Sequence, residues 1–258
     1  MLDGFVRTLT AGKRVLMNTD TRADIVAHII EKAKEFGASL AGIASVESLK
    51  VSPSYDACGK PPYYEGYGSN IEWPEDAKSV LVLALSHPKS KPELDWWSRM
   101  PGITLGNRQL MNLANKMSQW IRQELDINTH LVVYHVEAGG IFLKDAAALA
   151  GLGVIGKNNL LITPEFGPRV RLRALLLDAD LQPTGPIAFD PCAGCDMPCR
   201  KACPQEAFGD GSYTFPVCNK QMTENETSSA VVENWVNDSP GRVIKYCRTC
   251  ELACPVAL

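Results

Sequence analysis

The stretch Cys192-Ala-Gly-Cys195-Asp-Met-Pro-Cys199-Arg-Lys-Ala-Cys203-Pro204 is separated by 42 residues from a second stretch, Cys247-Arg-Thr-Cys250-Glu-Leu-Ala-Cys254-Pro255. Cys218 lies between the two stretches, and of the nine cysteines in this 258-residue chain only Cys58 stands apart. In a reducing compartment, cysteines gathered in this way indicate a metal centre and not a set of disulfides.

Both stretches end in Cys-Pro, the pattern in which closely spaced thiolates bind one four-iron cluster and the cysteine before proline binds another. The sequence therefore predicts two [4Fe-4S] clusters with exchanged fourth ligands. The first set of ligands is Cys192, Cys195, Cys199 and Cys254, and the second is Cys203, Cys218, Cys247 and Cys250.

Two zinc sites are the alternative, because cysteine pairs two residues apart also suit tetrahedral zinc. Zinc does not explain why both stretches end in Cys-Pro, or why four thiolates lie within one short run. One departure affects the first cluster: three residues separate Cys195 from Cys199, where the usual bacterial ferredoxin spacing has two.

Upstream of the cysteines, hydrophobic periodicity predicts a mixed α+β fold without a regular βαβ repeat. The expected helices are Thr21–Phe36, Arg108–Leu125 and Ile141–Ala150, and the expected strands are Ser39–Ala44, Ser79–Leu85, His130–Val136 and Val170–Asp178. Residues 52–74 are expected to form a long loop, because proline and glycine recur there. Gln182–Pro186 is the expected boundary between a domain of residues 1–185 and a cysteine-rich domain of residues 186–258.

The composition excludes several functional classes. Lys and Arg number 26 against 29 Asp and Glu, a net charge of −3, which leaves no bulk basic field for holding nucleic acid. The longest apolar run is the six residues Val80–Leu85, too short for a membrane span. The first twenty residues do not fit a secretory signal, so we expect a cytoplasmic protein.

Three further stretches carry a family resemblance: Phe36-Gly-Ala-Ser-Leu-Ala-Gly-Ile-Ala44, Asp76-Ala-Lys-Ser-Val-Leu-Val-Leu-Ala84 and Ala150-Gly-Leu-Gly-Val-Ile-Gly-Lys-Asn-Asn-Leu-Leu-Ile162. Joined to the double cysteine pattern, they make the chain resemble the epoxyqueuosine reductases and, more distantly, the corrinoid reductive dehalogenases. The likeness covers roughly residues 23–255.

The resemblance implies a nitroreductase-like N-terminal domain that holds a base-off cobalamin, and a C-terminal ferredoxin-like domain whose two clusters reduce the cobalt. Reduced ferredoxin or flavodoxin would load the clusters. The family's proton donor lies fourteen residues before the first glycine of the Gly-Leu-Gly motif, and Glu137 stands there.

Two departures bear on the substrate. The family's Tyr-His pair is absent from Gly106–Leu110, and the helical-repeat extension used beside tRNA does not follow the last cysteine. We therefore expect tRNA to be an unlikely partner, and a small molecule or another protein's corrinoid to be the substrate. The alternatives are a non-catalytic electron carrier that activates a corrinoid protein, and a flavin site in the N-terminal domain.

Other candidate residues each have a plainer explanation. The glycines of the turn at 151–158 would let a flat cofactor approach the backbone, or would only allow a tight turn. The candidate cofactor ligands are Gly151, Gly153, Gly156, Lys157, Asn158, Arg169 and Arg171, with Arg173 on the same expected strand face. The arginines would bind anionic groups, or would lie on a solvated face.

A few residues outside these motifs could also take part in catalysis or cofactor binding. His135 could relay protons beside Glu137, or could be an ordinary half-buried histidine. Cys58 could be a corrinoid ligand or redox thiol, although a single cysteine in such a loop is more often incidental. Tyr63, Tyr64 and Tyr67 could close over a cofactor or simply pack the loop.

Overall fold

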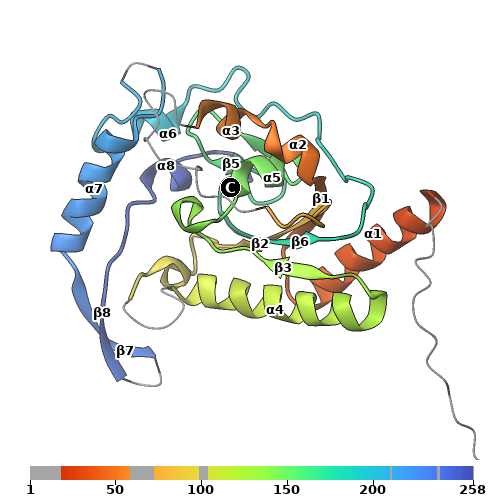
Figure 1. The fold of residues 1–258 in the computed structure, drawn as a ribbon. Coiled ribbons are helices and arrows are strands. Elements are labelled where there is room, and N and C mark those ends of the chain that lie inside the picture. The colour runs from red at the N-terminus through yellow and green to blue at the C-terminus, as the bar shows by residue number, and fades with distance from the viewer. Residues whose placement is uncertain (1–18, 59–72, 99–103, 210, 237–238, 258) are drawn as a thin grey trace, which may run out of the picture.

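The computed structural model describes residues 19–58, 73–98, 104–209, 211–236 and 239–257 (Figure 1). The helices are α1 Thr19–Glu35, α2 Val46–Lys50, α3 Pro53–Ala57, α4 Leu105–Leu125, α5 Leu143–Leu149, α6 Pro198–Lys201, α7 Phe215–Thr227 and α8 Thr249–Leu252, with 3-10 helices η1 Pro92–Asp95 and η2 Val136–Ala138. The strands are β1 Leu40–Ser45, β2 Ser79–Ser86, β3 Thr129–Leu131, β4 Val154–Ile155, β5 Leu161–Ile162, β6 Val170–Leu177, β7 Ala230–Val236 and β8 Ser239–Val243.

A four-stranded sheet in the order β1-β2-β6-β3 organises the first two thirds of the chain, and every neighbouring pair is antiparallel. Strand β2 is central: Leu81 pairs with Ile43 on one side and with Leu175 on the other. The mixed α+β class predicted from the sequence is confirmed.

The central strands are buried on both faces, which explains why β2 is an unbroken apolar run. Alternate residues of a strand point to opposite faces, so Leu81 and Leu83 join one core and Val80 and Val82 the other. Helices α1 and α4 cover the first face, and α2 and α5 cover the second (Figure 1). On α4 the apolar residues Leu110, Leu113, Met117 and Ile121 are buried along one stripe, and Leu125 at the end of this stripe is partly buried.

The expected boundary segment lies along the edge of this sheet. Thr184 accepts a hydrogen bond from the Ile43 amide (2.9 Å) and donates one to the Ala150 carbonyl (2.6 Å). Beyond it come α6, α7, the β7–β8 hairpin and α8 (Figure 1). This second region returns to the first through a bridge between Trp97 and Ile244. Division into two domains at residue 185 stays a prediction.

Three segments differ from the sequence expectation. Residues 53–57 of the expected loop form α3, and the glycine-rich turn becomes a β4–β5 hairpin. The expected strand His130–Val136 is shorter in the structure: β3 ends at Leu131, and further along the chain the Gly140 amide donates to the His135 carbonyl (2.9 Å) and closes a turn. His135 and Glu137 therefore do not share a strand face.

Among the described residues, none of the helices has the length and apolarity to cross a bilayer.

Candidate functional site

The four cysteines expected to bind the first cluster converge from two ends of the C-terminal region. Cys192 and Cys195 precede α6, Cys199 lies within it, and Cys254 follows α8. Burial raises the pKa of Cys199, and the charges of Cys254, Cys195 and Cys192 raise it further. The extra residue between Cys195 and Cys199 coincides with a left-handed Met197 (φ 52°), which turns the chain into α6.

The second quartet lines one small cavity of about 190 Å³. Cys203, Cys218, Cys247 and Cys250 all border it. Burial raises the pKa of Cys250 to about 12, and the neighbouring Cys247, Cys218, Glu251 and Cys203 charges act in the same direction. Cys254 lies beside the cysteines of the first quartet and Cys203 lines the cavity of the second. That these groups bind clusters with exchanged ligands stays a prediction.

Both quartets suit a group that binds thiolates. Backbone amides point at the sulfurs, from Lys157 to Cys192 Sγ (3.5 Å) and from Ala207 to Cys203 Sγ (3.4 Å), and such donors favour the charged form. Coordination deprotonates a thiol outright, which would relieve the raised pKa values. In the described ranges, no group of three or more His, Cys, Asp or Glu side chains is arranged to hold a single metal ion.

A second, larger cavity of about 830 Å³ lies between the sheet region and the cysteine-rich region. Its volume falls in the ~300–1,000 Å³ range of small-molecule and cofactor sites. Apolar side chains from three elements line one part: Ile141, Leu143, Leu161, Val170 and Leu172. Residues of the cysteine-rich region, among them Phe215, Met222, Tyr246 and Cys247, line another part. Cys247 therefore borders both cavities.

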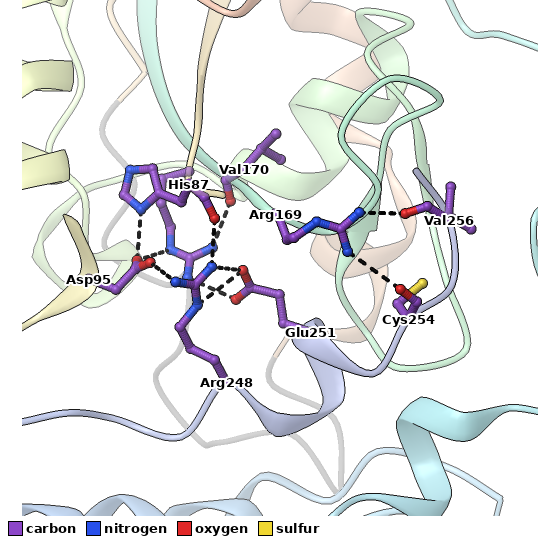
Figure 2. A network of polar contacts seen from close by, with 9 residues as sticks. His87, Asp95, Arg169, Val170, Arg248, Glu251, Cys254 and Val256 are labelled. Carbon is purple, nitrogen blue, oxygen red and sulfur yellow. Dashed lines mark hydrogen bonds and ion pairs between the residues drawn. The ribbon is translucent and has the colours of Figure 1, made fainter. Parts of the chain in front are cut away.

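A closed ring of charges forms part of the wall of this larger cavity (Figure 2). Asp95 binds Arg171 Nε (2.8 Å) and Arg248 Nη1 (2.6 Å), and Glu251 binds Arg171 Nη2 (2.9 Å) and Arg248 Nη2. His87 Nδ1 lies 2.8 Å from Asp95 Oδ1, and its carbonyl accepts from Arg248. The ring joins η1 and β6 to the Cys247–Cys250 segment.

The ring also sets the ionisation of Asp95. Burial alone would raise the pKa of this carboxyl. The hydrogen bond with His87 and the positive charges of Arg171 and Arg248 outweigh burial, and they hold the pKa below its ordinary value. Asp95 is therefore ionised near neutral pH and neutralises the two arginines together with Glu251.

The three glycines of the predicted cofactor motif pack against the chain itself. A Cβ on Gly153 would lie 2.2 Å from the Ile162 carbonyl oxygen, and one on Gly156 would lie 2.2 Å from the Ile162 side chain. Gly151, in a left-handed conformation, packs on the backbone of Thr184 and Gly185. None of the three is among the residues lining either described cavity, so contact with a cofactor stays a prediction for them.

The other predicted cofactor ligands divide between three places. Lys157 faces the first quartet through its amide, and its carbonyl accepts from Arg200 (2.8 and 3.1 Å). Asn158 lines the small cavity of the second quartet. Arg171 lines the large cavity as part of the charge ring.

The remaining two arginines of the expected strand face hold protein groups. Arg169 precedes β6 and donates to the carbonyls of Cys254 (3.4 Å), Val256 and Ala257, which fixes the end of the chain beside the sheet (Figure 2). Arg173 donates to Asn107 Oδ1 (2.6 Å) and lies over the Tyr134 ring.

The predicted proton donor lies next to the large cavity. Glu137 is the middle residue of η2, and its neighbours His135 and Val136 line the cavity. Its role stays a prediction. Cys58 caps the C-terminal end of α3 and lines neither of the two described cavities. Tyr63, Tyr64 and Tyr67 lie outside the described residues.

Sequence reasoning missed Asp95, Lys144, Arg248 and Glu251. Lys144 borders both cavities and donates to the Asn159 carbonyl (2.7 Å), and burial lowers its pKa. The sequence could have pointed to Arg248 and Glu251, because each directly follows a cysteine of the second quartet. A charged side chain at such a place needs a partner of opposite charge close to the thiolates. Nothing in the sequence marked Asp95 or Lys144.

The chain is similar in sequence to proteins named epoxyqueuosine reductase and reductive dehalogenase. An epoxyqueuosine reductase of Gloeobacter violaceus is 27% identical over 92% of the chain and 77% of the relative. A tetrachloroethene reductive dehalogenase of Sulfurospirillum multivorans is 32% identical over 92% of the chain and 51% of the relative. An epoxyqueuosine reductase of Lactococcus garvieae is 27% identical over 70% of the chain and 52% of the relative. The chain thus spans about half the length of two of these three. No protein-family model matches.

Solved structures show the same fold. An epoxyqueuosine reductase bound to a modified tRNA-Tyr stem loop aligns with a TM-score of 0.62 at 20% identity, over 92% of this chain and 66% of that one. A reductive dehalogenase described with B12-dependent dehalogenation aligns at 0.51 and 20% identity, over 77% and 27%. The expectation that tRNA is an unlikely partner finds no support here. The predicted resemblance is confirmed: the homologues of this chain are named epoxyqueuosine reductase and reductive dehalogenase.

Proposed function

We propose that this protein is an iron-sulfur reductase in which two [4Fe-4S] clusters feed electrons into the 830 Å³ cavity. The observation that carries the proposal is the double position of Cys247, which belongs to the second quartet and also lines the large cavity. A cluster bound by the second quartet would thus lie next to the large cavity and could pass electrons to a molecule bound there. In this proposal residues 1–185 form the nitroreductase-like unit and residues 186–258 the ferredoxin-like unit.

The first quartet suits the role of the entry cluster. None of its four cysteines lines the large cavity, so its electrons would pass to the second quartet before they reach the substrate. The hairpin turn at 156–159 lies between the quartets, since Lys157 bonds Cys192 and Asn158 borders the cavity of the second. Ferredoxin or flavodoxin is the proposed external donor.

The cavity suits a large, mostly apolar cofactor with polar edges. Ile141, Leu161 and Leu172 give it an apolar wall, while Arg171 and Arg248 present guanidinium groups held in place by carboxylates. Cobalamin combines an apolar ring with amides and a phosphate, and when bound it supplies low-potential cobalt chemistry. The relative described with B12-dependent dehalogenation supports this choice.

The chain's own residues would manage solvent and protons. The apolar wall excludes water, which strengthens every charge interaction within the cavity. A substrate that gains electrons also needs a proton, and Glu137 is the proposed donor because His135 and Val136 beside it line the cavity. Burial against an apolar cofactor would raise the pKa of such a carboxyl toward neutrality.

The proposed substrate is an electrophilic small molecule. The relative solved with a tRNA stem loop makes a tRNA nucleoside the second candidate. A flavin in the same cavity is the alternative to cobalamin. A non-catalytic carrier that activates a corrinoid protein is not favoured, since the relatives are named reductases.

Cofactor binding tests the proposal directly. Anaerobically purified, cluster-loaded protein should bind cobalamin at micromolar concentration with a spectral change toward the base-off form. Leu143→Trp, at the cavity wall, should weaken binding at least tenfold. Met111→Trp, on the exposed face of α4, should not. If the parent binds neither cobalamin nor flavin, the cavity is not a cofactor site and the electron-carrier function replaces this proposal.

A further inference from the structure

The side-chain amide of Asn158 is buried, and only one of its two ends has a hydrogen-bond partner. The residue is only 2% exposed. Its Oδ1 accepts from the Leu160 backbone amide (3.2 Å), and among the described residues its Nδ2 has no hydrogen-bond partner. Because a backbone N–H must face an acceptor, the Leu160 contact fixes which end of the side chain is oxygen. The unpartnered group is therefore the NH₂ donor.

The place of that donor is unusual for a structural asparagine. Asn158 lines the cavity of about 190 Å³ formed by the second quartet. A buried amide without a partner costs roughly 1–3 kcal/mol, so a non-hydrogen-bonding residue of similar size would be better tolerated if the cavity stayed empty. An acceptor inside the cavity removes that penalty.

Three other donor side chains around this cavity are bonded to protein oxygens. Lys144 binds Asn159, Gln205 binds Gln221 (3.2 Å) and Glu224 (3.1 Å), and Arg248 binds Glu251. Asn158 differs because its Nδ2 has no hydrogen-bond partner among the described residues, while the same cavity is lined by the four cysteines of the second quartet. The tight packing of Gly153 and Gly156 on Ile162 sets the hairpin that carries Asn158 to this position.

We propose that Asn158 Nδ2 donates a hydrogen bond to a sulfur of the second cluster and raises its reduction potential. The inference rests on the proposed function, because it requires the cluster. A hydrogen bond to sulfur stabilises the reduced, more negative state, and such bonds are among the factors that set cluster potentials. Asn158 is thus a positioning and tuning residue of the cluster that borders the large cavity.

Redox titration followed by electron paramagnetic resonance tests the inference without measuring activity. The variant Asn158→Leu keeps the number and branching of the side-chain heavy atoms and removes the donor, while Gln205→Leu alters the same cavity but removes an amide already bonded to protein. Both are compared with the parent chain after iron analysis. In Asn158→Leu, the reduction potential of one cluster should fall. At a fixed applied potential, the ratio of reduced to oxidised cluster should be roughly tenfold lower than in the parent, equivalent to about 59 mV for one electron. The other cluster and Gln205→Leu should stay within twofold of the parent.

Each outcome decides something. Parent protein without iron overturns the proposed function and this inference together. Intact clusters with the same potentials in Asn158→Leu and parent overturn the inference alone, as does an equal shift in Gln205→Leu. If Asn158→Leu loses the second cluster, the parent labelled with ¹⁵N in asparagine side chains decides: hyperfine coupling of an amide ¹⁵N to the reduced cluster supports the bond, and its absence overturns it.

Discussion

Neutralising Asp95 tests the charge ring that ties the sheet region to the Cys247–Cys250 segment. The Asp95→Asn variant keeps the shape of the side chain but removes the charge that meets Arg171, Arg248 and His87. The carboxylate is only 13% exposed, and the side chain of Arg248 only 11%. Leaving a buried charge without its partner costs about 3–5 kcal/mol. Because Glu251 still binds both arginines, we expect the lower end, about 3 kcal/mol.

Thermal unfolding of the cluster-loaded protein measures this loss. At ~2–4 °C per kcal/mol for a chain of this size, Tm should fall by roughly 6–12 °C at a fixed scan rate. The control is Asp76→Asn, whose carboxylate is 49% exposed and pairs with His130 at 3.1 Å. Exposed pairs contribute about 0–1 kcal/mol, so this variant should lose at most ~4 °C.

The pH dependence of the Asp95 effect follows from the direction of its pKa shift. The folded pKa is lower than the ordinary value, so the ionised group stabilises the fold fully above the unfolded pKa of ~3.9. That contribution is lost only as pH falls through the depressed folded pKa. The difference in Tm between Asp95→Asn and parent should therefore be constant from pH 6 to 8. A Tm equal to that of Asp76→Asn would refute the ring as a buried link.

Three other substitutions probe the cysteines, the proton donor and the hairpin. Cys254→Ala should lower the iron content by more than the ~4 atoms of one cluster, because the exchanged ligands interlock the two sites and metal binding drives folding there. The control Cys58→Ala should keep all the iron. Loss of one cluster with the signal of the second unchanged would contradict the coupling. Glu137→Gln should lower the reductive rate by ~10²–10⁴-fold with clusters intact, and parental rates across pH 6–8 would exclude Glu137 as donor. Gly153→Ala would place a Cβ 2.2 Å from the Ile162 carbonyl oxygen and should lower the free energy of unfolding by about 1–3 kcal/mol in denaturant titration. Unchanged stability would show that the hairpin backbone shifts to accommodate the methyl group.

The parts of the fold that follow from periodicity could be predicted. The apolar run at Val80–Leu85 lies within β2, and the expected helix Arg108–Leu125 matches α4 except that α4 begins three residues earlier, at Leu105. The grouping of the cysteines also follows from the two Cys-Pro endings, which predict that Cys254 joins the first quartet and Cys203 the second. In the structure Cys254 returns to Cys192, Cys195 and Cys199, and Cys203 joins the later cysteines.

Features that depend on tertiary packing could not be predicted. The end of the expected strand is replaced by η2 and by a turn in which the amides of Gly139 and Gly140 donate to the carbonyls of Val136 and His135, and no alternation of apolar residues reveals such a turn. The arginines at 169, 171 and 173 were expected to face a ligand or solvent, yet Arg169 holds the chain end and Arg171 closes a ring with Asp95 and Glu251. Their partners lie about 75 to 90 residues away in the chain, beyond the reach of local pattern.

Iron and acid-labile sulfide analysis of the anaerobically purified chain tests the central claim most directly. If Cys192, Cys195, Cys199 and Cys254 form one site and Cys203, Cys218, Cys247 and Cys250 the other, the protein should contain about eight iron and eight sulfide per chain. Its reduced form should give the interacting signals of two four-iron clusters. About two zinc per chain, with neither iron nor sulfide, would contradict the account.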